Sequence, residues 1–181
     1  FRKTFTPQSR PIQRHETPAV EFAKTAAIYV EMPGKVPEPL GFDTWTYRSS
    51  PVCGWTLNAS SPFIELAYED ALALDVNTER LTKHTQGVLA VCELLEQFHA
   101  KGIAHGDLTF HNAMLYLEGN RIQPMLIDLA SSLRLGEISA QDRQKAIKDD
   151  FSELYRDLVL AQIYLGPLRN AHAQEAIRRI D

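Results

Sequence analysis

The chain has 181 residues, enough for one hydrophobic core or for a small lobe packed on a larger one. Its hydrophobic share of 44% and charged share of 23% are ordinary for a globular protein, and its net charge of -4 argues against a nucleic-acid-binding surface. Cys53 and Cys92 favour neither a disulfide framework nor a zinc site, which indicates a reducing cytoplasm. No apolar run approaches the ~20 residues that a membrane-spanning helix needs.

The N-terminal part of the sequence predicts short strands around one helix. The first five residues, FRKTF, have strand character, and because no methionine precedes them we expect the natural N-terminus to lie further upstream. Thr17 and Pro18 form a typical helix start, and the prolines and glycines of PGKVPEPLG end that helix. Aromatic and aliphatic residues between 42 and 68, divided by two turn signals, predict two or three antiparallel strands.

After Tyr68 the pattern becomes mainly helical. Between Leu81 and Lys101 apolar residues recur with the 3.6-residue spacing of a buried helix face, and Gly102 stands where a helix C-cap belongs. The segments 112–117 and 122–127 read as two strands of a hairpin, and residues 141–165 are expected to be mostly helical. The sequence therefore predicts a β-rich N-terminal part and a mainly helical C-terminal part that carries a hairpin.

Three polar residues stand out in the C-terminal part. Asp107 lies on a loop between a helix and a strand, Asn112 follows five residues later, and Asp128 closes the second strand of the hairpin. Alone, Asp107 or Asn112 would be read as a turn-capping or strand-initiating residue. As an ordered set with Asp128, they favour a reaction centre.

The stretches that carry these residues resemble motifs of the protein-kinase-like superfamily. HGDLTFHN is similar to the catalytic loop H-R-D-L-x-x-x-N, and LIDLASS is similar to the strand that ends in D-F-G. The resemblance implies an α+β, bilobal kinase-like fold in a single domain 1–181. Its small β-rich N-lobe with one helix would comprise 1–67, and its reduced, mainly helical C-lobe 68–181.

The same resemblance implies ATP and Mg²⁺ as cofactors and assigns the catalytic residues. Asp107 would orient the attacking hydroxyl and accept its proton, while Asn112 and Asp128 would supply the hard oxygen ligands that Mg²⁺ prefers. Lys3 would be the ATP-binding lysine, and Glu21, 18 residues later, its pairing glutamate. Glu16 is a less favoured partner because it precedes the helix start.

Other residues receive roles from the same resemblance. In SPFIELAYED, the last N-lobe strand would run into the hinge, where Glu65, Leu66 and Ala67 would offer backbone groups to adenine. His105 is expected to brace the catalytic loop, and His111 either contacts phosphate or is solvated. Asp149 and Asp150 are read either as an N-terminal helix cap or as the family's brace for the catalytic loop.

The departures from regulated protein kinases are equally informative. Gly106 replaces the arginine that receives a phosphorylated activation loop, Leu129 and Ala130 replace Phe-Gly, no A-P-E follows, and only 53 residues come after Asp128. The HGD form is that of aminoglycoside phosphotransferases, lipopolysaccharide kinases and the compact RIO-like kinase associated with tRNA threonylcarbamoylation. Minimal bacterial effector kinases are similarly short. A Gly-rich phosphate loop would lie before Phe1.

These features favour an ATP- and Mg²⁺-dependent phosphotransferase, a minimal atypical serine/threonine protein kinase that is constitutively active. The alternatives are a small-molecule or glycolipid hydroxyl kinase and a pseudokinase acting as a binding module. A protein acceptor is preferred because the chain has little room for extra acceptor-binding helices and because its net charge does not suit a basic membrane-facing surface. A cytoplasmic location is expected, or delivery into a host cell if the protein is a bacterial effector, with a regulatory protein as a further partner.

Overall fold

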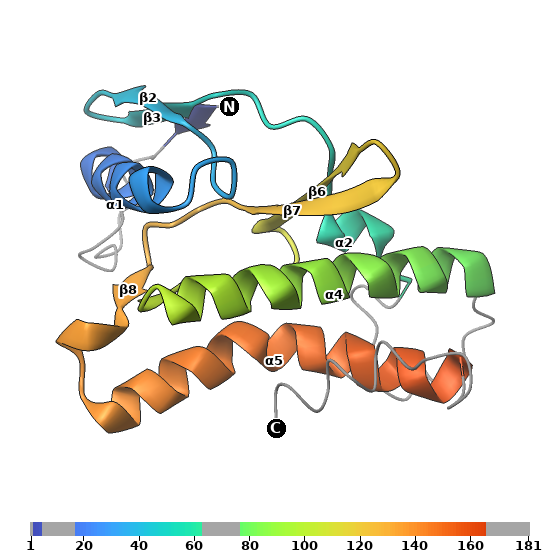
Figure 1. Ribbon diagram of the computed structural model, residues 1–181. Coiled ribbons are helices and arrows are strands. Elements are labelled where there is room, and N and C mark those ends of the chain that lie inside the picture. Colours follow the sequence, from blue (N-terminus) through green and yellow to red (C-terminus); the bar gives the residue numbers. More distant parts are fainter. Residues whose placement is uncertain (1, 5–16, 63–76, 166–181) are drawn as a thin grey trace, which may run out of the picture.

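The computed structural model describes residues 2–4, 17–62 and 77–165 (Figure 1). Near the N-terminus, three antiparallel strands in the order β1-β3-β2 form a small sheet, on which helix α1 packs. A second antiparallel sheet, in the order β4-β6-β7, lies over the long helices α4 and α5. The elements of the first layer are β1 (Arg2–Thr4), α1 (Pro18–Glu31), β2 (Pro39–Phe42) and β3 (Thr46–Ser49).

The remaining elements form the larger, mainly helical part of the molecule. The two-residue strands β5, just after α4, and β8, after the β6–β7 hairpin, pair with each other. The bounds are β4 (Trp55–Thr56), α2 (Leu57–Ser60), α4 (Thr78–Ala100), β5 (Ile103–Ala104), β6 (Ala113–Glu118), β7 (Arg121–Leu126), β8 (Leu133–Arg134), η1 (Leu135–Glu137) and α5 (Ala140–Leu165).

Helix α1 begins where the sequence predicts. The Thr17 hydroxyl accepts a hydrogen bond from the Val20 N–H at 3.2 Å, and Pro18 is the first helical residue. The buried face of the helix contains Ile28 but also the charged residue Glu21. A carboxylate in a buried helix face is costly unless it has partners, so this position indicates a function beyond packing.

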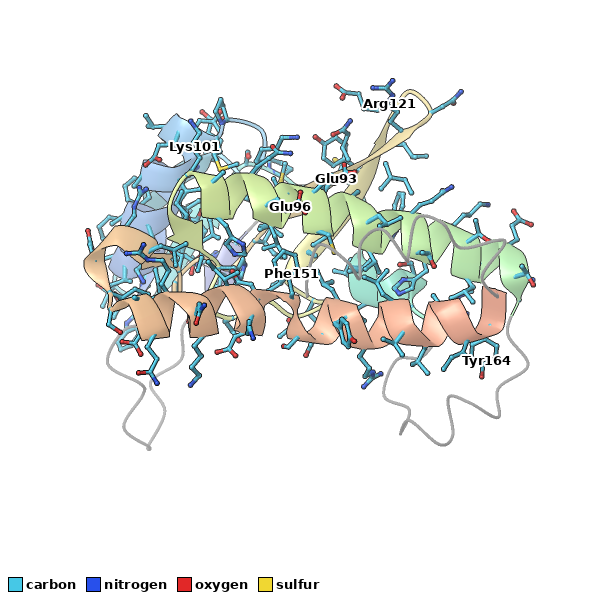
Figure 2. All side chains as sticks on the ribbon, turned by 60° about the horizontal axis from the view of Figure 1, so that its bottom comes forward. Glu93, Glu96, Lys101, Arg121, Phe151 and Tyr164 are labelled. Atoms are coloured by element: carbon cyan, nitrogen blue, oxygen red, sulfur yellow. The ribbon has the colours of Figure 1, made fainter. Side chains whose placement is uncertain are left out.

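Helices α4 and α5 lie side by side and antiparallel, with Phe151 between them (Figure 2). Asn77 caps the start of α4, and Gly102, with φ of 72°, follows its last residues in the left-handed conformation typical of a helix end. Each fully buried leucine in this layer contributes roughly 1.5–3 kcal/mol through burial. The core unites α4, α5 and the hairpin through Val91, Leu95, Phe98, Leu115, Leu126, Leu154 and Leu158.

The β6–β7 hairpin forms the bridge between the core and the polar residues. Its strands pair from Ala113 with Leu126 to Glu118 with Arg121, and Gly119 begins the two-residue turn with φ of 61°. The hairpin packs closely on α4, because a side-chain carbon on Gly87 would lie 2.6 Å from Leu115 Cδ1. The predicted hairpin is thereby confirmed.

One region differs from the sequence-based expectation. The second expected strand is shortened to β4, which pairs with β6 instead of the N-terminal sheet, and helix α2 follows at once. The helix forms because the Thr56 hydroxyl accepts the Ala59 N–H at 3.3 Å and Leu57 is fully buried. The third expected strand and the lobe boundary at residue 67 lie outside the described residues.

In the described parts of the chain, no helix combines the length and the apolar character needed to cross a membrane.

Candidate active site

Three charged residues from distant parts of the sequence meet at one point. Lys3 on β1 lies with its Nζ 3.5 Å from Glu21 Oε2 on α1, and it also pairs with the carboxylate of Asp128, just beyond β7. The Glu21 side chain is 2% exposed, whereas those of Lys3 and Asp128 are 23% and 33% exposed. The structure therefore brings together three residues that the sequence assigned to one site.

Glu21 is the most constrained of these three residues. Burial raises the pKa of its carboxyl group and the nearby Asp128 charge raises it further, while Lys3 and the Leu129 N–H oppose this rise. The Leu129 N–H donates to Oε1 at 3.0 Å, but no described group donates a hydrogen bond to Oε2. One lysine is thus shared by two carboxylates.

The backbone at Asp128 has an uncommon conformation. With φ of 60°, Asp128 is the only non-glycine residue with positive φ in the described ranges. This conformation turns the chain sharply after β7, so that Leu129 enters the core while the Asp128 side chain stays partly exposed beside Lys3. Such local strain is typical of functional sites.

The hairpin brings Asn112 close to Asp128. The Ile127 N–H donates to the Asn112 carbonyl at 2.9 Å, and the Asn112 side-chain Nδ2 donates to the Asp107 carbonyl at 2.9 Å. The side-chain oxygen of Asn112 is not used in that bond. A carboxylate and an amide oxygen are hard donors, so the residues present fit Mg²⁺.

No cluster of three or more His, Cys, Asp or Glu side chains in the described parts of the chain forms a metal site. Asp128 and Asn112 would hold Mg²⁺ together with phosphate and water oxygens, which is the usual arrangement for nucleotide-bound magnesium. Asp107 itself is exposed at the surface of its loop, where a substrate can reach it.

His105 and Asp150 hold the predicted catalytic loop in place. Asp150 accepts the backbone N–H groups of His105 at 2.8 Å and Gly106 at 2.9 Å, and its Oδ2 lies 2.9 Å from His99 Nε2. Burial lowers the pKa of His105, and the geometry suits a neutral ring, since Nε2 donates to the Ile127 carbonyl at 3.0 Å while Nδ1 accepts the Asp107 N–H at 3.4 Å. The loop is thereby tied to both α5 and the end of β7.

Of the two predictions for Asp149 and Asp150, the role as a brace for the catalytic loop is correct for Asp150, and the role as an N-terminal helix cap is wrong for both residues. Helix α5 begins at Ala140, with the Ser139 hydroxyl accepting the Asp142 N–H at 3.1 Å, so both aspartates lie inside the helix. Asp149 is exposed and Asp150 is buried. The hinge residues Glu65, Leu66 and Ala67, and also Glu16, lie outside the described residues.

A cavity of about 360 Å³ lies beside the predicted catalytic loop. The exposed His111 lines this cavity, and a phosphate contact by its side chain, one of the two alternatives from the sequence, remains a prediction. The cavity is lined by residues of α2, the loop and α5, which are Asn58, Thr109, Phe110, His111, Ser152, Glu153, Arg156 and Asp157. We call it the loop-side cavity.

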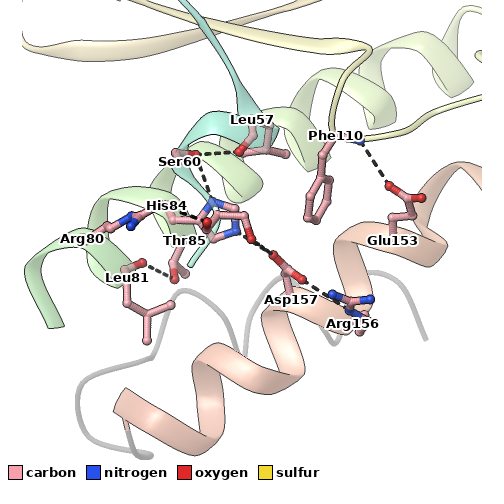
Figure 3. Close-up of polar contacts among 11 residues, drawn as sticks. Leu57, Ser60, Arg80, Leu81, His84, Thr85, Phe110, Glu153, Arg156 and Asp157 are labelled. Carbon is pink, nitrogen blue, oxygen red and sulfur yellow. Dashed lines mark hydrogen bonds and ion pairs between the residues drawn. The ribbon is translucent and has the colours of Figure 1, made fainter. Parts of the chain in front are cut away.

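Asp157, at the wall of the loop-side cavity, is a buried carboxylate that sequence reasoning missed (Figure 3). Its Oδ2 accepts the Ser61 hydroxyl at 2.8 Å and lies 2.9 Å from His84 Nε2. Its Oδ1 has no hydrogen-bond donor among the described residues, although Arg156 Nε is 3.6 Å away. The one available sequence signal was its seven-residue spacing from Asp150, which places both on one face of α5.

The fold and this order of polar residues are those of the protein-kinase-like class of proteins. Among solved structures, the chain is similar to the Rio2 kinase-ADP/Mg2+-phosphoaspartate complex from Chaetomium thermophilum, with a TM-score of 0.51 and 16% sequence identity. The match covers 97% of this chain and 51% of that chain, so the protein spans about half the length of the kinase it resembles. The expected kinase-like α+β fold is confirmed.

The family follows from a second comparison. The model of the lipopolysaccharide kinase (Kdo/WaaP) family matches residues 65–176, more than half of the sequence, and the chain belongs to this family. The expected place of the chain in the protein-kinase-like superfamily is thereby confirmed. Asp107, Asn112 and Asp128 lie within the matched residues, whereas Lys3 and Glu21 precede them. No curated protein sequence matches the chain.

Proposed function

We propose that the protein transfers the γ-phosphoryl group of ATP to a sugar hydroxyl of a glycolipid. The observation that carries this proposal is the meeting of Lys3, Glu21 and Asp128, because phosphoryl transfer depends on positioning and on compensation of phosphate charge. Lys3, held by Glu21, binds the ATP phosphates, and Asn112 with Asp128 would hold Mg²⁺. When bound, the metal ion neutralises charge on the transferred phosphoryl group.

Asp107 is the proposed proton acceptor for the attacking hydroxyl. It is exposed, and its loop is fixed on one side by Asp150 and on the other by Asn112. The hydroxyl oxygen bonds to phosphorus as its proton passes to the Asp107 carboxylate, and ADP leaves with the electrons of the broken P–O bond. The brace keeps Asp107 in reach of the hydroxyl without a large rearrangement.

The acceptor is where this proposal departs from the preference for a protein substrate. Membership of a lipopolysaccharide kinase family favours a glycolipid, and the loop-side cavity supports a polyhydroxylated acceptor. The wall of the cavity offers carboxylate, amide and hydroxyl groups next to an aromatic ring. An acceptor could therefore bind there without the extra helices that other small-molecule kinases use. Thr109 lines it only two residues after Asp107. A serine or threonine acceptor in a protein is the alternative.

Use of ATP favours the cytoplasmic location that the sequence suggested, and delivery into a host cell has no support here. The pseudokinase alternative is disfavoured because no charged residue assigned to the reaction is missing from the sequence, and Lys3, Glu21 and Asp128 lie together.

The test uses the full-length protein with labelled ATP and Mg²⁺. The acceptors are lipopolysaccharide whose core phosphates have been removed, free core sugars and a cell lysate. We expect label in the glycolipid. Label in protein bands alone would establish the protein-kinase alternative, and absence of both label and ATP hydrolysis would overturn the assignment.

Asp107→Asn is the matched control for this experiment. We expect it to keep ATP affinity near that of the wild type while slowing transfer by about a hundredfold or more, because only the proton acceptor is lost. A collapse of ATP affinity with an unchanged rate at saturation would show that Asp107 is structural and contradict its role.

A further inference from the structure

The segment that follows Asp128 is fixed between helix α1 and the catalytic loop. On the α1 side, Leu129 donates to Glu21, and the Lys24 ammonium group donates to the carbonyls of Ala130 at 2.6 Å and Ser132 at 2.7 Å. We call residues 129–132 the post-Asp128 segment. It is short and leads directly into β8.

On its other side, the post-Asp128 segment lies against Gly106. A side-chain carbon on Gly106 would lie 2.3 Å from the Ser131 carbonyl oxygen, and Gly106 has φ of 80°. Both facts require glycine at this position. The carbonyls of residues 130 and 132 face Lys24 while that of Ser131 faces the catalytic loop, and the Ser132 N–H donates to the Leu129 carbonyl at 3.0 Å, so the segment forms a tight turn.

Lys24 is placed to connect this segment to the site. It lies three residues after Glu21, so both side chains leave the same face of α1. Its ammonium group is half-buried and bonds to two carbonyls instead of a carboxylate. Burial lowers the pKa of Lys24, and the nearby Glu21 charge opposes this shift only in part. Arg134 and Glu137 are the charged residues that line the cavity beside it. A lysine engaged in this way differs from an ordinary solvated surface lysine.

We propose that Lys24 is a positioning residue for phosphoryl transfer: it holds α1 to the post-Asp128 segment so that Glu21 and Asp128 stay on either side of Lys3. The proposal rests on the proposed kinase reaction and adds the device that assembles its site. Regulated kinases order the equivalent segment by phosphorylation. In this protein the hydrogen bonds of Lys24 would order it without a modification. The enzyme is then active without prior modification, as its sequence suggests.

The test compares Lys24→Met, Lys24→Arg and a control, Arg134→Gln. Arg134 pairs with Glu31 and also joins α1 to the residues after Asp128, but this pair is exposed and distant from Glu21. Two measurements are made on each full-length variant: the rate of ATP turnover at saturating ATP and Mg²⁺, and hydrogen exchange of the Leu129 amide. Thermal melting reports the folded fraction.

We expect Lys24→Met to lower turnover at saturation at least about tenfold and to speed exchange of the Leu129 amide, with the protein still folded. Lys24→Arg should keep most of the wild-type turnover and most of the protection of the Leu129 amide, because a guanidinium can donate to the same carbonyls. Arg134→Gln should behave as the wild type.

Wild-type turnover and exchange in Lys24→Met would overturn the proposal. The proposal would also be overturned if the turnover of Lys24→Met fell only in proportion to its unfolded fraction and Lys24→Arg did not recover it. That result would mean that Lys24 only stabilises the fold. If the wild type shows no phosphoryl transfer at all, the kinase proposal fails, and exchange of the Leu129 amide still decides whether Lys24 orders the segment.

Discussion

Helices α4 and α5 are joined by two histidine–aspartate pairs that look alike and differ in their surroundings. Asp150 pairs with His99 and Asp157 with His84, each with 2.9 Å between histidine Nε2 and the carboxylate. Both aspartates are buried and lie on one face of α5. In the first pair, both carboxylate oxygens accept backbone N–H groups of the catalytic loop, whereas in the second Oδ1 lacks a donor within the described chain.

The difference separates a structural use of a buried carboxylate from a binding use. A fully hydrogen-bonded buried carboxylate fixes its neighbours rigidly, and Asp150 fixes the loop that carries Asp107. An unfilled oxygen on a buried carboxylate is energetically costly and is retained where a ligand can complete it. Asp157 approaches this character, because the nearest cation to its buried Oδ1 is Arg156 Nε at 3.6 Å, too far for a hydrogen bond (Figure 3). A hydroxyl of the proposed acceptor in the loop-side cavity would reach Oδ1 only after the exposed Arg156 side chain moves aside.

Removing Asp150 should have the largest effect. Asp150→Ala leaves the buried N–H of His105, the partly buried N–H of Gly106 and the His99 ring without their acceptor, and we expect the free energy of unfolding to fall by about 3–5 kcal/mol. Turnover should be lost together with stability. Urea denaturation and ATP turnover measure both, with the exposed neighbour Asp149→Asn as the control, which should change stability by no more than about 0.5 kcal/mol. A folded, fully active Asp150→Ala variant would contradict the brace.

The second pair should respond differently. Asp157→Asn keeps the size of the side chain but weakens the bond to Ser61 and removes the charge that faces Arg156, so we expect a modest loss of stability, about 1–2 kcal/mol. The KM for the glycolipid should rise about tenfold or more, while the KM for ATP stays unchanged. Steady-state kinetics with each substrate varied in turn measures this split. Equal changes in both KM values would assign Asp157 to general packing.

Much of this scaffold was predictable because its determinants are local. Thr17 and Pro18 mark the start of α1, and Gly102 marks the end of α4, since caps depend on neighbouring residues alone. The meeting of Lys3, Glu21 and Asp128 was foreseen only through the resemblance to kinases, because no local pattern joins residues so far apart in sequence.

The parts that sequence reasoning missed depend on backbone partners or on tertiary contacts. Lys24 bonds to carbonyl groups, which every residue has, so its partners leave no trace in the sequence. Helix α2 replaces part of an expected strand because burial of Leu57 and a threonine cap prevail over the strand pattern. Asp157 could be distinguished from a surface aspartate only after the position of α5 was known.

The smallest expected effect concerns Glu21, a third buried carboxylate, which resembles Asp157 in having one oxygen without a donor. Burial raises its pKa in the folded chain, so between its unfolded and folded pKa values the folded state binds more protons than the unfolded state. The stability that Glu21 contributes therefore falls as pH rises through this window. Lys3, Asp128 and Lys24 are the charged groups facing it.

Glu21→Gln removes this titration, so the melting temperature of the variant minus that of the wild type should increase as pH rises above the ordinary glutamate range and then level off. Glu31→Gln on the same helix is the matched control. Arg134 lowers the pKa of Glu31, so its contribution is present above the unfolded pKa and is lost as pH falls through the folded one. The melting temperature of Glu31→Gln minus that of the wild type should therefore rise toward zero as pH falls, which is the opposite pH dependence to that of Glu21→Gln. The change should be small, because the Glu31–Arg134 pair is exposed. Melting curves from acidic to neutral pH measure both slopes, and a flat difference for Glu21→Gln would show that Lys3 fully compensates the buried charge.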